Sequence, residues 1–198
     1  MDRCSAVAEN QTAKDYLVAG RECGSCTVCC KALKIDVPEL KKLAGVLCEH
    51  CTEHVGCKIY QTRPPVCAGW HCGWRGMRYL GDDWRPDRCG VLIVIVGGED
   101  GEIPAGFAQV ALKFDIVDSP HVLAWDPLIG FIASEIERGR PVFLGIPAAV
   151  GYERRKVFLN YLLTDAVASR DRTLMFNGLV AAFQMGVRDE MKEKTIFD

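Results

Sequence analysis

The cysteines of this chain are crowded into one stretch. The sequence has 198 residues and 11 cysteines, and all of them except Cys4 lie between Cys23 and Cys89. Cysteine thiolates are the ligands that soft metal centres such as zinc and iron–sulfur sites prefer. A cysteine-dense first half followed by an ordinary apolar second half indicates that the first half assembles around metal, while the second half builds its own core.

The overall composition is that of a globular protein. Hydrophobic residues make up 49% of the chain, charged residues 25%, and the net charge is −2, which excludes the disordered class and gives no reason to expect nucleic acid or an acidic membrane surface as a partner. No segment approaches the roughly 20 apolar residues that span a bilayer. The arginines between Cys72 and Cys89 are spread among acids, so a solvated surface is expected for Arg75, Arg78, Arg85 and Arg88.

The N-terminal sequence has no apolar stretch like that of a secretory signal. We therefore expect a cytoplasmic protein, in a compartment where thiols are kept reduced. In that setting a cysteine cluster is more often metal-binding or redox-active than a disulfide framework. The odd cysteine count also argues against complete pairing.

Three regions are expected. Residues 1–22 form an N-terminal extension with a helix at 6–19, residues 23–90 form the cysteine-rich region, and residues 91–198 form an α+β region, which could be continuous with residues 23–90. Leu40, Leu43, Ala44 and Leu47 follow Pro38 at helical spacing, which predicts a helix that ends at Cys48. Residues 48–90 are expected to be irregular, so that bound metal would stabilise them.

The second half alternates strand and helix patterns. Strands are expected at 91–96, 110–116 and 142–146, and Gly97–Gly101 is expected to be a hairpin turn rather than a dinucleotide loop. Asp126 and Pro127 predict the start of a helix that Gly139 closes. Two more helices are expected at 153–168 and 172–187, the second burying Met175, Leu179, Ala182 and Phe183. The predicted class is α+β: an irregular cysteine-rich metal-binding region packed on a small mixed sheet with helices.

The first cysteine motif is Cys23-x2-Cys26-x2-Cys29 followed directly by Cys30. Two-residue gaps let a looping backbone aim three thiolates at one centre. In an extended chain neighbouring side chains point in opposite directions, so Cys30 is expected to serve a second centre or a bridge. We also expect Cys57 and Cys67 to converge with the first three cysteines.

The later cysteines extend the motif as Cys48-x8-Cys57-Lys-Ile-Tyr60-x2-Arg63-Pro64-x2-Cys67-x4-Cys72. In this order they resemble the zinc- or iron-chelating CxxCxxCC family (YkgJ-like proteins), and the resemblance covers residues 23–72. This chain departs from the family pattern at Ala68, because we associate a basic residue with that position in the family. The resemblance implies a ligand set of eight thiolates: Cys23, Cys26, Cys29, Cys30, Cys48, Cys57, Cys67 and Cys72. Eight thiolates could hold two tetrahedral zinc ions or furnish iron–sulfur centres.

Several alternatives stay open at this point. The thiols could pack as small buried hydrophobes, or Cys26/Cys29 or Cys48/Cys51 could form a dithiol–disulfide switch. The cysteines outside the eight (Cys4, Cys51 and Cys89) and the histidines His50, His54 and His71 could complete a site, although surface or outer positions are favoured for the histidines. Arg63 is expected to hydrogen-bond carbonyls or to balance thiolate charge.

The sequence thus predicts a metal-binding protein with an iron–sulfur cluster or, less favoured, Zn²⁺. Its centre would have a structural role or would serve metal handling or electron transfer. The alternative is an iron–sulfur-dependent enzyme of the redox or methyl-transfer type with a pocket beside the cluster, because a domain of the resembling family also occurs in a flagellin lysine methylase. Closed four-thiolate sites would favour the first function, and an open coordination position would favour the second.

Overall fold

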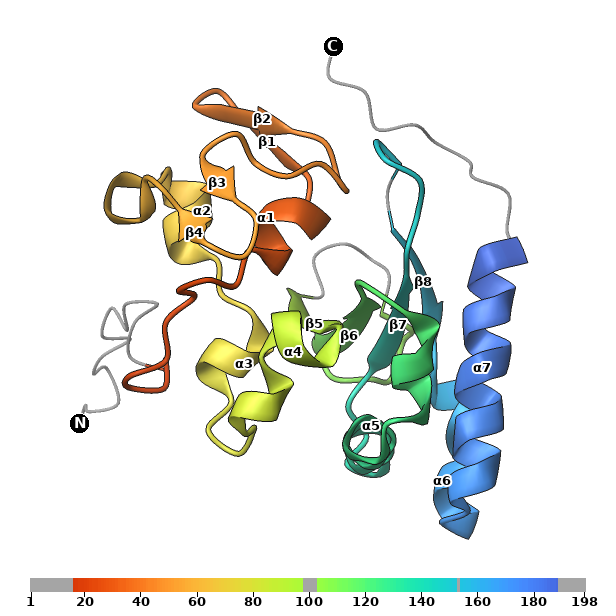
Figure 1. Ribbon diagram of the computed structural model, residues 1–198. Coiled ribbons are helices and arrows are strands. Elements are labelled where there is room, and N and C mark those ends of the chain that lie inside the picture. The colour runs from red at the N-terminus through yellow and green to blue at the C-terminus, as the bar shows by residue number, and fades with distance from the viewer. Residues whose placement is uncertain (1–15, 98–102, 153, 189–198) are drawn as a thin grey trace, which may run out of the picture.

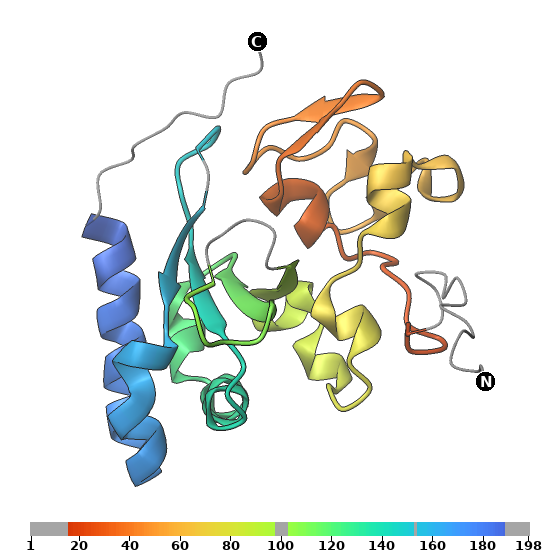
Figure 2. The same ribbon diagram turned by 180° about the vertical axis from the view of Figure 1, so that it is seen from behind.

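The computed structural model describes residues 16–97, 103–152 and 154–188. The expected N-terminal helix therefore lies almost entirely outside the described residues, as does Cys4. Figures 1 and 2 show the cysteine-rich half at one end of the molecule and helices α6 (Asn160–Ser169) and α7 (Arg172–Arg188) at the other, with a sheet between them. Helices, a mixed sheet and small antiparallel sheets confirm the predicted α+β class.

The central sheet has four strands in the order β5-β6-β7-β8. They are β5 (Val91–Gly97), β6 (Val110–Ile116), β7 (Val142–Ile146) and β8 (Arg155–Phe158). The β5/β6 and β7/β8 pairs are antiparallel, whereas β6/β7 is parallel. The three strands that the apolar runs predict are all present, and the antiparallel pairing of β5 with β6 fits a hairpin, whose turn at 98–102 lies outside the described residues.

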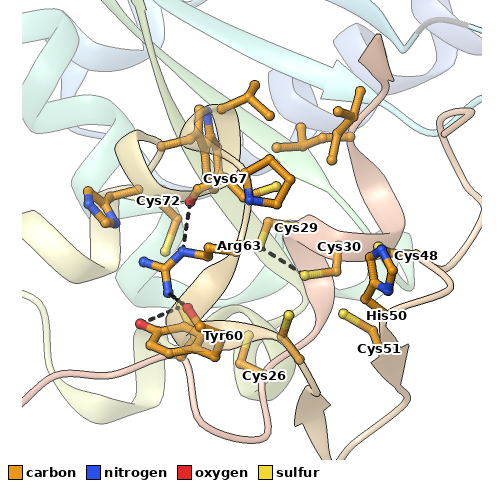
Figure 3. A pocket seen from close by; sticks show the side chains of 18 of the residues that line it. Cys26, Cys29, Cys30, Cys48, His50, Cys51, Tyr60, Arg63, Cys67 and Cys72 are labelled. Carbon is orange, nitrogen blue, oxygen red and sulfur yellow. Dashed lines mark hydrogen bonds between the residues drawn. The ribbon is translucent and has the colours of Figure 1, made fainter. Parts of the chain in front are cut away.

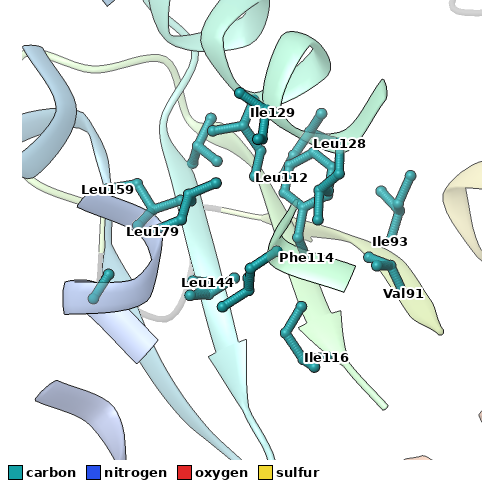
Figure 4. Packing of buried hydrophobic residues seen from close by; sticks show 14 of the residues in the cluster. Val91, Ile93, Leu112, Phe114, Ile116, Leu128, Ile129, Leu144, Leu159 and Leu179 are labelled. Atoms are coloured by element: carbon teal, nitrogen blue, oxygen red, sulfur yellow. The ribbon is translucent and has the colours of Figure 1, made fainter. Parts of the chain in front are cut away.

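The main core lies where the sheet meets helix α5 (Asp126–Glu137), α6 and α7 (Figure 4). Phe114 of β6 and Leu144 of β7 are fully buried, and Leu128 of α5 and Leu179 of α7 pack in the same cluster. The predicted buried face of the last helix is confirmed, because Met175, Leu179 and Ala182 are buried and Phe183 packs beside them. This apolar face supplies the main hydrophobic stabilisation of the second half.

The predicted helix over 153–168 is wrong at its start, because 155–158 form strand β8 and α6 begins only at Asn160. The chain switches from strand to helix at this buried asparagine. Asn160 Oδ1 accepts a hydrogen bond of 2.8 Å from the Val142 amide, and its Nδ2 donates one to the Arg140 carbonyl. Strand β8 also pairs the edge of β7, which would otherwise leave unpaired backbone groups.

Helix α5 is present as predicted, but Asp126 does not cap it. Trp125 occupies the cap position, and Asp126 is the first helical residue, where its carboxylate accepts a 2.6 Å hydrogen bond from Arg172 Nε. Gly139 follows the helix with φ of +75°, and its amide donates to the Ile136 carbonyl. The predicted closing glycine is therefore confirmed, since a residue with a Cβ is strained in this conformation.

The predicted helix that ends at Cys48 is wrong. The chain instead forms an antiparallel hairpin of β1 (Ile35–Val37) and β2 (Leu40–Lys42). Leu40 and Lys42 are both buried while Lys41 between them is exposed. This two-residue period puts Leu40 and Lys42 on one face, an arrangement that a helix cannot produce. The leucine spacing alone did not distinguish the two structures.

Short elements make up the rest of the cysteine-rich half. They are α1 (Val28–Ala32), β3 (Cys51–Thr52), β4 (Gly56–Cys57), the 3₁₀ turn η1 (Tyr60–Thr62), α2 (Pro65–Gly69), α3 (Gly73–Gly76), η2 (Asp82–Trp84) and α4 (Pro86–Cys89), and a further 3₁₀ turn η4 (Pro120–Ala124) follows β6.

Residues after Cys72 pack on the sheet. Trp74, Leu80 and Trp84 belong to the main core, and the Cα of Gly73 lies so close to β5 that a Cβ there would stand 2.6 Å from Ile93 Cγ2. The division of the chain at residue 90 stays a prediction, and core packing crosses it. None of the helices in the described ranges has the length and hydropathy of a membrane span.

Candidate metal centre

One cavity of about 310 Å³ collects the cysteines of the first half (Figure 3). Nine cysteines line it, namely the eight that the motif resemblance implies and Cys51: Cys23, Cys26, Cys29, Cys30, Cys48, Cys51, Cys57, Cys67 and Cys72. Cys89 is not among the lining residues, and its thiol contacts the backbone of Trp84 and Val91. As expected, Cys57 and Cys67 lie close to the first motif, since they line the same cavity.

The first motif forms a tight turn followed by a helix. The Cys26 amide donates a 2.9 Å hydrogen bond to the Cys23 carbonyl, and helix α1 then carries Cys29 and Cys30. The assumption of an extended chain at these two residues is wrong, because on the helix their sulfurs do not point in opposite directions and lie 3.9 Å apart. The two neighbouring thiols therefore form a contact pair.

Strand β4 is pressed against the loop of the first motif. Gly56 has φ of +129°, and a Cβ at this position would stand 2.6 Å from the carbonyl oxygen of Gly24. Only glycine allows the two backbones to approach this closely. The close approach brings Cys57, the next residue, to the cavity beside the first motif.

A second group of cysteines is held together by backbone contacts. The Cys48 amide donates to the Cys30 carbonyl at 3.1 Å, and the Cys51 amide donates to the Cys48 carbonyl at 2.9 Å. Cys51 and Cys57 are register partners in the β3/β4 pair. Cys67 lies on α2, where its amide donates to the Pro64 carbonyl.

Two arginines connect the elements that carry these thiols. Arg63 donates from Nε to the Cys67 carbonyl and from Nη1 to the Tyr60 carbonyl, at 3.2 and 2.9 Å, and its guanidinium lies 3.9 Å from the centre of the Tyr60 ring. The expected role of Arg63 as a donor to carbonyls is confirmed. Arg75 Nη1 lies 3.4 Å from Cys23 Sγ and 3.1 Å from Tyr60 Oη.

Arg75 contradicts the predicted solvated surface, because only 8% of it is exposed. Its Nε is buried and has no hydrogen-bond partner within the described part of the chain. Arg78 and Arg88 are exposed as expected, and Arg85 is paired with Asp87. The position of Arg75 three residues after Cys72 was the available sequence signal, and the charged residues that follow it favoured a solvated surface instead.

Lys42 is a second buried cation that the sequence patterns did not identify. It is 5% exposed, and its ammonium group donates to the carbonyls of Lys31, Leu33 and Leu43. Burial lowers the pKa of Lys42, and the nearby thiols of Cys48 and Cys30 act in the opposite direction. The only sequence signal for the burial of Lys42 was its two-residue spacing from Leu40.

Burial disfavours the ionised form of several thiols in the cavity. It raises the pKa of Cys26 and Cys67, and it raises the pKa of Cys72 to about 11. The pKa of Cys30 shifts in the opposite direction: the hydrogen bond with Cys29 lowers it to about 6, with further help from Cys51, Lys42 and Arg63. A bound cation would supply the positive charge that an assembly of thiolates lacks here.

The histidines are placed in different ways. His50 and His71 line the cavity, whereas His54 is exposed in the turn between β3 and β4 with φ of +61°. His50 and His54 are four residues apart but are not on a helix, so helical spacing does not give them a common face. His50 Nε2 lies 3.9 Å from the Glu49 carboxylate.

The donor chemistry of the cavity suits zinc or iron, since thiolates are ligands of both. The ten cysteines of the described chain are free. In their present rotamers, no group of three Cys, His, Asp or Glu side chains in the described ranges is arranged to hold a metal ion. Binding would therefore require thiols that already share the cavity to turn towards a common centre.

Comparisons of the chain with protein-family models, with curated proteins and with solved structures give no match.

Proposed function

We propose that this chain is a metal-binding protein that holds an iron–sulfur cluster or Zn²⁺ through the thiolates of the cysteine cavity. The observation that carries the proposal is the shared cavity itself: nine cysteines from six separate segments face one space of about 310 Å³. Reduced cysteines that serve only as small hydrophobes have no reason to gather in this way. The family resemblance of the motif stays a prediction that agrees with this function.

The charges around the cavity support the same function. Lys42 and Arg75 are buried cations beside the thiols, and Arg75 Nε lacks a hydrogen-bond acceptor among the described residues. A buried donor without a partner costs free energy, and thiolate or sulfide acceptors would satisfy it. Hydrogen bonds to sulfur and nearby positive charge are also the means by which proteins tune iron–sulfur centres. We therefore favour iron–sulfur over zinc, with electron transfer, metal handling or a structural role as the outcome.

Metal analysis of protein purified without oxygen tests this function. Iron–sulfur occupancy predicts brown protein with broad absorption and comparable amounts of iron and acid-labile sulfide. Zinc occupancy predicts colourless protein without sulfide, because Zn²⁺ is d¹⁰ and redox-silent. Cys89→Ser is the matched control, since Cys89 does not line the cavity. Protein that carries neither metal, and takes up neither under reducing conditions, contradicts the function.

An iron–sulfur-dependent enzyme is the second candidate, and the size and walls of the cavity favour it. Apolar side chains including Leu33, Ile59, Val66 and Trp70 line the space together with the thiols. A volume of about 310 Å³ is at the lower end of the range for small-molecule sites. Redox or methyl-transfer chemistry would need an iron with an open coordination position. Cyanide added to the reduced protein should then change its electron paramagnetic resonance spectrum without loss of iron, whereas a fully thiolate-ligated centre should not respond.

A further inference from the structure

The cavity thiols fall into two sets that are separated by packing, backbone contacts and charge. We define the inner set as Cys23, Cys26, Cys29 and Cys72, and the outer set as Cys30, Cys48, Cys51, Cys57 and Cys67. We propose that each set is a metal site of its own, so that the protein binds two metal centres, with Cys51 as a ligand of the outer one. This inference rests on the proposed function and extends it to the number and composition of the sites.

Hydrophobic packing separates the two sets. The buried residues Leu40, Cys48 and Cys51 form a small cluster, against which Cys30, Cys57 and Cys67 pack. All five outer thiols therefore belong to this cluster, which is distinct from the main core. Cys72 of the inner set packs against the main core at the sheet instead.

Backbone geometry holds the outer set together. Cys30, Cys48 and Cys51 are connected by consecutive amide-to-carbonyl hydrogen bonds of 3.1 and 2.9 Å. Cys51 and Cys57 are directly opposite in an antiparallel pair, so their side chains leave the same face with Cβ atoms about 4.5–5.5 Å apart. Figure 3 shows Cys30, Cys48 and Cys51 grouped on one side of the cavity and Cys72 on the other.

The inner set is connected through different contacts. The Cys23–Cys26 turn is closed by a 2.9 Å hydrogen bond, and Arg75 joins Cys23 to the segment that carries Cys72. The Arg75 amide donates to the Cys72 carbonyl at 3.0 Å while its guanidinium reaches Cys23 Sγ. The inner set thus has Arg75 as its cation, whereas Lys42 lies with the outer set.

The two sets come into contact at the first motif. Gly56, which precedes Cys57 of the outer set, lies against the Gly24 carbonyl. The sulfurs of the two sets meet at the Cys29–Cys30 pair, 3.9 Å apart.

This contact defines the competing arrangement. The sulfurs of a tetrahedral zinc site with 2.3 Å bonds lie about 3.8 Å apart, so Cys29 and Cys30 could instead share one metal. In that case the cavity would hold a single centre drawn from both sets. The two arrangements predict different partners for Cys29 and for Cys30.

Zinc titration of the full-length, reduced, metal-free chain distinguishes them. If there are two sites, elemental analysis of the desalted wild type should give two zinc ions per chain. The inner double variant Cys26→Ser/Cys72→Ser and the outer double variant Cys51→Ser/Cys57→Ser should each bind one, and Cys89→Ser should bind two. One zinc in the wild type that both double variants lose would overturn the two-site inference and leave the proposed metal-binding function intact. No zinc or iron in the wild type would overturn the proposed function itself.

A second measurement needs no variant and so does not depend on variants folding. Wild-type protein with one equivalent of zinc is alkylated briefly, and protected thiols are identified by mass spectrometry. Two sites predict that protection develops in sets, with Cys29 protected together with other members of the inner set and Cys30 protected together with other members of the outer set. Joint protection of Cys29 and Cys30 at one equivalent, without a second protected set at two equivalents, would overturn the inference.

Discussion

Arg75 Nη1 lies 3.4 Å from Cys23 Sγ, although 52 positions separate the two residues in the chain. The same atom lies 3.1 Å from Tyr60 Oη, so one buried guanidinium connects the first cysteine motif, η1 and α3. A cation at this distance stabilises a thiolate and holds the side chains around it in place.

Arg75→Gln should therefore weaken metal binding at the inner set. Loss of a hydrogen bond to a metal ligand typically lowers metal affinity by about 10- to 100-fold. We expect a decrease of this size in competition titrations with a chelator. The matched control is Arg78→Gln, because Arg78 is a nearby exposed arginine. Equal affinities of the two variants would show that the contact with Cys23 has no role in binding.

Lys42→Met should destabilise the cysteine-rich half. The ammonium group donates to three backbone carbonyls, and methionine would remove all three hydrogen bonds. The Lys31 and Leu43 carbonyls would keep the amide donors Gly45 and Val46, whereas the Leu33 carbonyl would lose the lysine donor. Loss of hydrogen bonds from a charged group costs about 1–3 kcal/mol, which urea unfolding of the metal-loaded protein can measure. Lys41→Met is the control, since Lys41 is exposed and its ion pair with Asp36 spans 4.0 Å. A similar free energy of unfolding for both variants would contradict the role of Lys42.

Cys30 should react faster than Cys89 in the metal-free protein near neutral pH. Its hydrogen bond with Cys29 lowers the pKa of Cys30 to about 6, so its thiolate forms as the pH rises through 6. Burial raises the pKa of Cys89 to about 11, so Cys89 should stay protonated until strongly alkaline pH. Because the thiolate is the nucleophile, iodoacetamide at pH 7 should label Cys30 well before Cys89. A Cys30 labelling rate that rises only above pH 8 would rule this out.

Metal removal should loosen the cysteine-rich half as far as Cys72 and leave the following residues protected. Trp74, Leu80 and Trp84 pack in the main core together with the sheet, so hydrophobic burial holds them without metal. Residues 23–72 have only a small cluster of their own. Hydrogen exchange with and without a strong chelator should show the change at 23–72, with residues 73–97 as the internal reference. Equal loss of protection in both segments would contradict this.

Elements whose patterns are local could be predicted from the sequence. The apolar runs of β5 and β7, the alternation in β6 and the buried stripe of α7 each specify an element from neighbouring residues alone. The spacing of the cysteines also sufficed to predict that they share one space. Helix α5 was predictable for the same reason, because Pro127 and Gly139 mark its ends.

Features that depend on distant partners could not be predicted in this way. Leucines at 40, 43 and 47 fit a helix, whereas the β1/β2 hairpin buries Lys42 against carbonyls at the end of helix α1. Residues 155–158 form a strand because β7 offers an edge. The burial of Arg75 and the division of the thiols arise from contacts across as many as 52 positions. Such contacts leave no periodic signal, since their free energy comes from pairs that meet only when the chain has folded.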